Sequence, residues 1–506
     1  MADYDAVVIG AGHNGLVTAA YLARDGLRTL LLEARPIVGG TAASESFAGA
    51  TVNVCNCDHL TFRTTPVPEE LGLASYGLRY LDLDPTQVAW AWSGGPSWSH
   101  HRDVGRTVDE LARTHPDEVD GYRAYLAAAR PAASLILAAA TEPPTLRGLS
   151  RLGLRKRFAG LPTVLRWSRS SAADVLRRYF RSDALIGPAL VGGPMVWGVS
   201  PERPGTGLGV LGYALRHVAT LGRPVGGSGA LTEALRAAFE HHGGELRTST
   251  PVARILCADG RAAGVALAGG TEITAGAVVS ACDPRRTFVE WLTNPPAAAA
   301  AMVARWQATE PAEGYESKID AVITTPPRLR DVDHDLGSTL CVAPSVADMD
   351  RAATTMAAAG EVLDRPALLV NVPSLLDPTM APPGRHVFSL EVLLTPYRHP
   401  WAISREPERW LQLVADLCEP GFLDSIVDWR AMTPDVYERD FHLPAGHATS
   451  FGGGPLAALR SGEPELTGYE TAVPGLYLTG AATFPGAGIW GASGRNCATV
   501  VRSRLE

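Results

Sequence analysis

Two histidines occupy positions where a side chain could move a proton. His59 directly follows Asp58, and His447 lies in the glycine-rich segment Gly446–Gly454. Histidine changes its charge near neutral pH, so each of the two is a candidate general base. The alternative for each is a structural role as a hydrogen-bonded loop residue. A base alone does not define the reaction. The type of reaction depends on a cofactor or a nucleophile elsewhere in the protein.

The cysteines do not form a pattern that indicates redox or metal chemistry. Seven cysteines are scattered along the chain, and none belongs to a Cys-x-x-Cys pair. Cys55 and Cys57 are the one close pair, and their spacing suits a zinc site poorly. We therefore expect no redox-active dithiol and no bound metal. The odd number of scattered cysteines favours reduced thiols in the cytoplasm.

Residues 6–24 have the pattern of a strand, a tight turn and a helix. The run Ala6–Ile9 is apolar, as is typical of a strand buried on both faces of a parallel sheet. It leads into a complete G-x-G-x-x-G turn, Gly10-Ala-Gly12-His13-Asn14-Gly15. In such a turn the glycines close the bend, admit a pyrophosphate and let the helix pack closely. The helix predicted from Asn14 to Arg24 directs its free N–H groups at the phosphates.

An acidic residue follows this unit at the expected distance. Thr29–Leu32 is predicted to be the second strand, and Glu33 comes directly after it, 23 residues beyond Gly10. At that position a carboxylate accepts hydrogen bonds from the ribose hydroxyls of an adenine dinucleotide. The pattern therefore predicts a dinucleotide site. His13 belongs to its phosphate turn, so we do not expect His13 to be catalytic.

The same glycine spacing recurs once in a context that does not support nucleotide binding. Gly207–Gly212 also matches G-x-G-x-x-G, but the preceding Ser200–Gly205 is not a buried strand. No strand ending in an acidic residue follows it either. We interpret this segment as a closely packed helix start, so a second dinucleotide has no predicted site.

The segment after Glu33 shows a family resemblance. Ala34-Arg35 is followed by Gly39-Gly40-Thr41, and with the opening glycine turn it resembles the flavin-binding start of the phytoene desaturase and amine oxidase superfamily. In that superfamily the diglycine passes close to the FAD pyrophosphate and the flavin. The resemblance implies that FAD is the cofactor and that these five residues contact it.

Three later segments resemble the same superfamily. Arg223–Ile255 matches its return to the nucleotide domain, with Val252 near the adenine, and Val278–Phe288 follows. Gly475–Val500 resembles the closing flavin motif, in which Gly480 and Ala481 reach the cofactor before a final helix. The resemblance places the turn before that helix, Ile489-Trp490-Gly491, at the flavin as well.

The resemblance is closest to the branch of carotenoid ketolases of the desaturase type. Cys57–Phe62, Glu70–Pro85 and Val372–Val387 are similar to that branch in particular. Two segments depart from the family pattern, Thr483–Ala487 and Gly446–Gly454, and both correspond to regions that lie close to the substrate in the family. The resemblance therefore places Phe451 and Phe484 in the substrate pocket, together with Asp58.

These segments predict an α/β fold with a Rossmann-like FAD-binding domain, built on a parallel sheet, and an interleaved α+β substrate domain. The FAD-binding domain is predicted to be discontinuous, and the substrate domain to carry a helical cap. The predicted ranges are 1–100, 220–300 and 455–506 for FAD binding, and 101–219 and 301–454 for the substrate domain.

Charge and hydropathy restrict the partners. The net charge of −8 argues against a nucleic-acid-binding protein, because the phosphate backbone demands clustered positive charge. The start of the chain runs directly into a strand, and the longest apolar stretch, Ala132–Ala140, is far shorter than a bilayer span. We expect a cytoplasmic protein that acts on a small molecule; the oligomeric state is left open.

One segment is basic, although the chain as a whole has a negative net charge. Residues 146–183 contain ten Arg or Lys residues and two Asp, interleaved with leucines, Phe158 and Trp167. This composition suits a helical patch that lies on the inner surface of an anionic membrane. The alternative is a solvated helical face that pairs with acidic residues elsewhere or with a second subunit.

The leading functional hypothesis is an FAD-dependent oxidoreductase that desaturates or oxidises a lipophilic or polycyclic small molecule by hydride transfer to flavin N5. Two other enzyme hypotheses remain: a redox-neutral flavin-dependent isomerase or cyclase, and an amine oxidase. A non-enzyme alternative is a flavin-free escort-type binding protein of the same fold. Its nucleotide loop is expected to be degenerate, whereas Gly10, Gly12, Gly15 and Glu33 are all present here.

Overall fold

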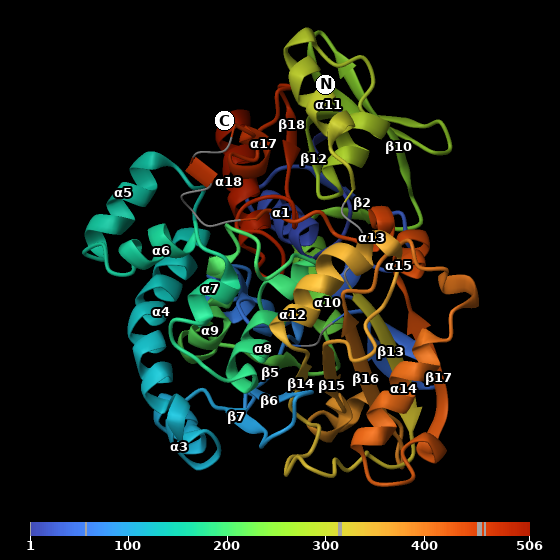
Figure 1. The fold of residues 1–506 in the computed structure, drawn as a ribbon. Helices are drawn as coiled ribbons and strands as arrows, with labels where there is room; N and C mark the ends of the chain where they lie inside the picture. Colours follow the sequence, from blue (N-terminus) through green and yellow to red (C-terminus); the bar gives the residue numbers. More distant parts are fainter. Residues whose placement is uncertain (1, 56–57, 312–315, 453–457, 460–461) are drawn as a thin grey trace.

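The computed structural model describes residues 2–55, 58–311, 316–452, 458–459 and 462–506. Figure 1 shows two large sheets with helices packed around and between them. Each of these sheets has seven strands, and neither is built from one continuous piece of chain. Cys57 and the end of the segment Gly446–Gly454 lie outside the described residues.

The first sheet has the strand order β10-β11-β12-β1-β2-β9, and β18 also pairs with β12. Strands β9, β2, β1, β12 and β18 run parallel to their neighbours, whereas β10 and β11 join β12 as an antiparallel extension. The strand bounds are β1 Tyr4–Ile9, β2 Thr29–Leu32, β9 Glu245–Arg247, β10 Val252–Ala258, β11 Arg261–Leu267, β12 Glu272–Ser280 and β18 Leu476–Leu478.

The parallel part of this sheet is buried because both of its faces are covered. Val8 packs with helices on one face, α1 (His13–Arg24), α10 (Gly229–His241) and α18 (Ala492–Leu505), and Val7 packs with the β10–β12 extension on the other. The prediction of a doubly buried first strand and of a Rossmann-like α/β fold is confirmed. Strand β2 has its predicted bounds, and α1 begins one residue earlier than predicted.

The second sheet has the strand order β17-β13-β16-β15-β14-β6-β7. Its strands are β6 Gln87–Ala91, β7 Trp98–His100, β13 Glu316–Ile323, β14 Leu340–Ala343, β15 Leu368–Asn371, β16 His386–Leu393 and β17 Ile426–Met432. One face packs on α14 (Glu406–Leu417) through Trp410 and Leu411. The other face meets the hairpin of β3 (Ser44–Phe47) and β4 (Ala50–Asn53), which directly follows the diglycine segment.

Strands β6 and β7 correct one predicted boundary. Residues 87–100 were expected in the FAD-binding domain, but β6 pairs in parallel with β14, and β7 pairs with β6 at the edge of the second sheet. Val88 and Leu340 are partners in this register although 252 positions separate them in the chain. The first segment of the nucleotide-binding domain therefore ends before Gln87, and the other predicted boundaries remain predictions.

A helical cap packs against the end of the second sheet that contains β14, β6 and β7. Its core contains a group of buried aromatic side chains, Tyr122, Tyr125, Trp167, Phe180 and Tyr213. Its helices are α3 Val104–Thr114, α4 Val119–Ala140, α5 Leu146–Arg155, α6 Leu161–Trp167, α7 Ala172–Leu176, α8 Asp183–Val191 and α9 Gly212–Val218. Short elements complete the chain: β5 Tyr80–Leu81, β8 Arg223–Pro224, α2 Val67–Glu70, α11 Ala300–Ala308, α12 Val346–Arg351, α13 Ala357–Ala359, α15 Pro434–Phe441 and α17 Pro464–Thr467.

The second glycine motif belongs to this cap. Gly207–Leu211 forms a 3-10 turn that leads into α9, and a Cβ on Gly207 would lie 2.5 Å from the carbonyl oxygen of Trp167. The glycine therefore permits close packing of two backbone segments, as the sequence predicted, and the motif follows no strand of the first sheet.

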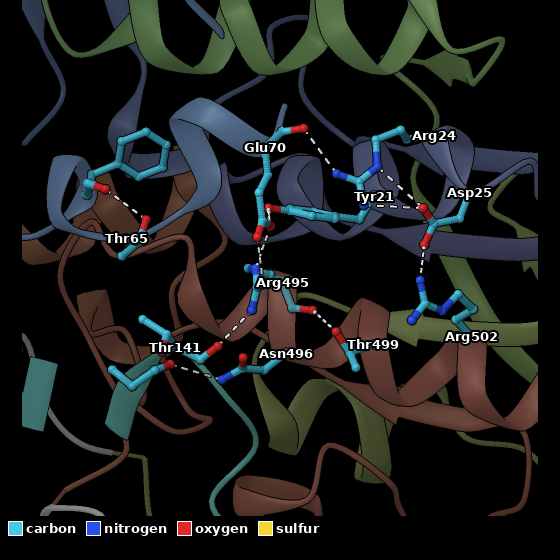
Figure 2. A network of polar contacts seen from close by, with 12 residues as sticks. Tyr21, Arg24, Asp25, Thr65, Glu70, Thr141, Arg495, Asn496, Thr499 and Arg502 are labelled. Atoms are coloured by element: carbon cyan, nitrogen blue, oxygen red, sulfur yellow. Dashed lines mark hydrogen bonds and ion pairs between the residues drawn. The ribbon is translucent and has the colours of Figure 1, made fainter. Parts of the chain in front are cut away.

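Polar contacts tie the cap to the nucleotide-binding domain at the end of α4. Figure 2 shows Arg495 of α18 between Glu70 and Thr141. Its guanidinium donates to both carboxylate oxygens of Glu70 at 2.7 and 2.8 Å and to the carbonyl oxygen of Thr141 at 2.7 Å. Asn496 donates to the carbonyl oxygen of Ala140 at 3.1 Å.

Within the described residues, no helix is both long enough and apolar enough to span a membrane.

Candidate functional site

A cleft follows the edge of the first sheet at which its parallel strands end. Gly10 follows β1, Glu33 follows β2, Ala281 follows β12 and Gly480 lies just beyond β18, and all four residues line the cleft. Ligands of parallel α/β sheets bind at this carboxyl edge because loops and helix N-termini converge there. Fourteen predicted cofactor residues line it: Gly10, Gly12, His13, Asn14, Gly15, Glu33, Ala34, Arg35, Gly39, Gly40, Thr41, Val252, Gly480 and Ala481.

The glycine turn has the geometry that its sequence predicts. Gly10 has φ +96°, and a Cβ there would lie 2.8 Å from the Cys282 sulfur; a Cβ on Gly15 would lie 2.0 Å from the carbonyl oxygen of Gly10. By contrast, a Cβ on Gly12 would meet no protein atom within 4 Å. Two glycines are thus needed for packing and backbone conformation, whereas Gly12 leaves space for a group that comes from the cleft.

Glu33 is held in place by the backbone of the turn. Its two carboxylate oxygens accept hydrogen bonds from the N–H groups of Ala11, at 2.7 Å, and Arg35, at 2.9 Å. A carboxylate offers about four acceptor positions, so two remain for the hydroxyl groups of a ribose. The side chain is nearly buried, and buried polar atoms in proteins are usually hydrogen-bonded.

The diglycine segment brings the next part of the chain against the turn. Gly39 has φ +113° and donates from its N–H to the carbonyl oxygen of Ala11 at 2.8 Å, and a Cβ on Gly40 would lie 3.4 Å from the Cα of Gly12. Nearby, Arg35 binds Glu45 through Nη2, while its buried Nη1 has no hydrogen-bond partner among the described residues. An unsatisfied guanidinium N–H on the wall of a cleft fits an anionic ligand such as the pyrophosphate of FAD.

The C-terminal segment approaches the same cleft from β18. Gly480 and Ala481 line it, and the N–H of Gly480 donates to the Ser493 hydroxyl at 3.1 Å. Ser493 also shares hydrogen bonds with the hydroxyl groups of Thr479 and Thr483, which fixes the loop on the first turn of α18. The predicted residues Ile489, Trp490 and Gly491 do not line the cleft; Gly491 caps α18 with φ +68°. Their contact with the flavin remains a prediction.

Several cleft residues were not predicted as site residues. Cys282, Asp283 and Arg286 follow β12, inside a segment whose family resemblance was noted. The signal that could have identified them is the parallel pairing of β12 with β1, since the ends of adjacent parallel strands meet. Phe441 and His442, at the end of α15, also line the cleft, and the Arg35 guanidinium lies 4.0 Å from the Phe441 ring centroid.

His59 lies in the interior and is not a lining residue of the cleft. Its Nδ1 is 2.8 Å from the Tyr80 hydroxyl and its Nε2 is 3.0 Å from the Ser228 hydroxyl, and the side chain is fully buried. Burial lowers the pKa of His59 to about 3, with the nearby His13 adding to the effect. With both ring nitrogens engaged, the geometry favours a structural role, and the catalytic role of His59 remains a prediction.

Asp58 is part of a buried ion pair. It binds Arg223 at 2.8 Å and accepts a hydrogen bond from Thr339 at 2.8 Å. Burial by itself would raise the pKa of Asp58, but the guanidinium of Arg223 and the Thr339 hydroxyl outweigh it and lower the pKa. Asp58 therefore joins β8 to the second sheet as a carboxylate, and its predicted place in the substrate pocket remains untested.

His447 lies in the cleft. It is 5% exposed, and its Nε2 is 3.4 Å from the carbonyl oxygen of Trp197, in the cap. Burial lowers the pKa of His447, so the ring is neutral at pH 7. The neighbouring Thr449 donates to the Asp283 carboxylate at 2.6 Å, which fastens this segment to the end of β12.

The two predicted aromatic pocket residues pack on each other. The Phe451 and Phe484 rings meet edge to face with centroids 6.1 Å apart, and the N–H of Phe451 donates to the carbonyl oxygen of Ala481 at 2.9 Å. Phe484 is buried, and its carbonyl oxygen accepts a hydrogen bond from Tyr469 at 2.6 Å. They therefore lie behind the cleft-lining turn at Ala481, and contact with a substrate remains a prediction.

Comparisons with known proteins agree with this geometry. Residues 8–68 match the model of an NAD(P)-binding Rossmann-like domain, and residues 197–502 match that of the flavin containing amine oxidoreductase family. The solved structure of a putrescine oxidase triple mutant has a TM-score of 0.65 and 16% identity, and the match covers 99% of this chain and 98% of that one.

Three relatives match over almost the whole chain. The rat "pyridine nucleotide-disulfide oxidoreductase domain-containing protein 2" is 28% identical over 100% of this chain and 94% of its own length. Prolycopene isomerase 1 of an Oncidium hybrid cultivar is 27% identical, covering 96% of this chain and 81% of its own. A lycopene-forming phytoene desaturase of Pseudescherichia vulneris is 28% identical over 99% of both chains.

The match to the family model covers more than half of the chain, and the glycine cradle, Glu33 and the orphaned donor of Arg35 fit an FAD pyrophosphate and ribose. The predicted superfamily is confirmed, and FAD is its cofactor. This chain belongs to the flavin containing amine oxidoreductase family, whose members include phytoene desaturase-like and amine oxidase-like proteins.

Proposed function

We propose that this protein uses FAD to desaturate or oxidise a lipophilic or polycyclic small molecule. The observation that carries the proposal is the intact nucleotide cleft, in which Gly12 leaves open space and Glu33 keeps acceptor capacity, with His447 among the residues that line the same cleft. FAD, when bound, supplies a flavin ring that accepts a hydride at N5.

The chain's own residues hold the cofactor and shield the reaction. The turn at Gly12 would receive the pyrophosphate, Glu33 the ribose, and Arg35 an anionic oxygen. The N-terminus of α18 follows Gly491, and its dipole would favour negative charge on a reduced flavin.

His447 is the residue that we propose for moving a proton. Oxidation of a C–H or N–H bond often requires removal of a second hydrogen as a proton, and a neutral imidazole can accept it. Because burial lowers the pKa of His447, the ring stays neutral at physiological pH. His59 is the less favoured candidate, since it is not among the residues that line the cleft.

The proposed substrate class rests on relatives and not on a defined pocket. The match to a phytoene desaturase over 99% of both chains supports desaturation of an apolar molecule. We place the reaction in the cytoplasm or at the inner membrane surface, where such a substrate would be available. A flavin-free escort role is disfavoured, because nothing in the glycine turn or at Glu33 is degenerate.

Two further reactions have specific support. A prolycopene isomerase matches over 96% of this chain, which supports a redox-neutral isomerase or cyclase. An amine oxidase is supported by the family model and by a fold shared with putrescine oxidase.

An anaerobic bleaching screen of the purified yellow protein separates these reactions. Carotenoids, polyketides and amines are added in turn, and the flavin absorbance is followed before and after air is readmitted. We expect a lipophilic compound to bleach the flavin and yield a product with one more double bond or a carbonyl group. Bleaching by amines alone would replace the proposal with an amine oxidase. A product that forms only on pre-reduced protein, without net electron transfer, would identify an isomerase. A colourless protein that takes up no FAD would refute all three.

A further inference from the structure

Helix α5 and the turn after it expose apolar side chains to solvent. In the described structure, Leu146 and Leu154 are the two most exposed leucines, at 72% and 67%, and Phe158 is 46% exposed. Figure 1 shows α5 at the outer edge of the cap, away from both sheets. We call residues 146–158 the α5 surface. Its exposed leucines contribute little to the core of the protein. Only contact with another molecule or a membrane would bury them.

The basic residues of this surface are arranged in a row beside the apolar ones. Leu146, Ser150 and Leu154 are spaced four residues apart, and so are Arg147, Arg151 and Arg155. Residues four apart lie on the same side of a helix, so the two rows run next to each other along α5. Lys156 and Arg157 extend the basic row into the turn, and every residue of both rows is exposed.

Most positive charges of the segment 146–183 have no ion-pair partner among the residues that the structure describes. Between residues 146 and 183 there are ten Arg or Lys side chains, and Arg177 is the one for which the described residues provide an ion pair, with Glu202. The five basic side chains of the α5 surface have no carboxylate partner among the residues that the structure covers. Pairing with acidic residues elsewhere in the chain therefore has no support among the described residues, whereas a solvated face, or one that pairs with a second subunit, stays an alternative.

The α5 surface is a formed structure and not a loose segment. The Thr145 hydroxyl caps α5 by accepting from the N–H of Gly148 at 3.1 Å. At the other end the chain reverses, and the Phe158 ring folds back onto Gly153, where a Cβ would lie 2.7 Å from the ring. Glycine at 153 thus lets the Phe158 ring pack beside Leu154 at the end of the basic row.

We propose that the α5 surface docks this protein on an anionic lipid bilayer. Leu146, Leu154 and Phe158 would enter the acyl boundary, and the adjacent row of arginines would bind the lipid phosphates. Charge complementarity supports this occupant: the chain as a whole carries a net charge of −8, so a bilayer would attract this region and repel the rest. Exposed leucines beside arginines fit a lipid interface better than a nucleic acid, which gains nothing from isolated leucines.

The docking proposal does not depend on the proposed reaction, and its test uses no substrate. The FAD-loaded protein is sedimented with phosphatidylcholine vesicles that contain or lack phosphatidylglycerol. We expect binding to the anionic vesicles only. Changing residues 155–157 to Glu should weaken the partition coefficient by about 100-fold or more, because each basic residue near an anionic surface contributes about fivefold. Leu154→Ser should weaken it by about tenfold at unchanged charge.

A matched control separates local docking from net charge. Arg79, Arg328 and Arg385 are exposed and lie outside the cap, and changing all three to Glu alters the net charge by the same amount. This control should keep most of the vesicle binding, and all variants should keep their yellow flavin and circular dichroism. The proposal is overturned if the wild type ignores anionic vesicles or if the control loses as much binding as the 155–157 variant. It is also overturned if Leu154→Ser has no effect while heparin binds with the same charge dependence, because the surface would then serve a soluble polyanion.

Discussion

Glu33→Gln tests whether the carboxylate at the end of β2 binds the adenosine half of FAD. In the structure Oε1 and Oε2 each accept one backbone N–H, from Arg35 and Ala11. Glutamine has one oxygen and one NH₂ group, so its NH₂ must face an N–H donor about 2.8 Å away, a typical N–H···O distance. One backbone N–H of the turn then loses its hydrogen-bond acceptor, and a ribose hydroxyl loses a charged acceptor.

The expected loss of affinity can be worked out from these bonds. A hydrogen bond to a charged group contributes about 1.5–3 kcal/mol, so replacing the carboxylate weakens FAD binding about 10- to 100-fold in Glu33→Gln. Glu33→Ala removes both ribose bonds, for a loss of about 3–6 kcal/mol, and such a protein should be purified without flavin. Glu233→Gln on the exposed side of α10 is the control and should bind FAD like the wild type.

The assay is a titration of deflavinated protein with FAD and, separately, with ADP, monitored by tryptophan fluorescence. ADP carries the same ribose and no flavin, so Glu33→Gln should weaken both ligands by the same factor. If FAD loses affinity while ADP does not, Glu33 acts on the flavin end and the assignment of the ribose is wrong. If neither changes, the nucleotide does not occupy the cleft in the orientation that the glycine turn implies.

Three further predictions follow from contacts described above. Gly12→Val should block FAD binding while the flavin-free protein keeps its unfolding temperature, whereas Gly15→Val should lower that temperature as well, because its Cβ collides with backbone; equal unfolding temperatures would contradict this. Because burial lowers the pKa of His59 to about 3, the unfolded chain binds a proton below about pH 6.5 that the folded chain does not, which destabilises the fold as the pH falls. Denaturant titrations should show that wild type loses about 2 kcal/mol more stability than His59→Gln between pH 7 and pH 5, and parallel losses would refute the buried neutral histidine. Arg495→Met should lower the free energy of unfolding by about 1–3 kcal/mol, because it removes the two hydrogen bonds to the Glu70 carboxylate and the hydrogen bond to Thr141 in the cap. The same titration measures this loss, and Arg495→Lys should recover part of it.

The sequence predicted the nucleotide cradle well because its determinants are local. Gly10, Gly12, Gly15 and Glu33 lie within one strand–helix–strand unit, and the physical reason for each is short-range: a positive φ, a close backbone contact or a carboxylate at a strand end. The apolar run of β1 likewise indicated burial on both faces before any partner was known.

The errors and omissions arise where distant segments meet. Strand β6 has an apolar pattern that suits either sheet, and only its pairing with β14 decides between them. Cys282 and Arg286 line the cleft because β12 is inserted beside β1, which local patterns do not specify. The catalytic role of His59 stays a prediction, but local sequence did not indicate that Tyr80 and Ser228, from two other parts of the chain, contact its two ring nitrogens.

The segment around His447 contacts residues that line the nucleotide cleft. It leaves α15 at Phe441, whose ring lies under the Arg35 guanidinium, and it is fastened at Thr449 to Asp283. Arg35 follows β2 and Asp283 follows β12, so the segment contacts residues that follow two different strands of the first sheet. An FAD pyrophosphate that engages the Arg35 guanidinium would therefore lie beside one end of the segment that carries His447. Because this segment contacts residues of the nucleotide cleft, we expect a substitution at Arg35 to affect both FAD binding and the placement of His447.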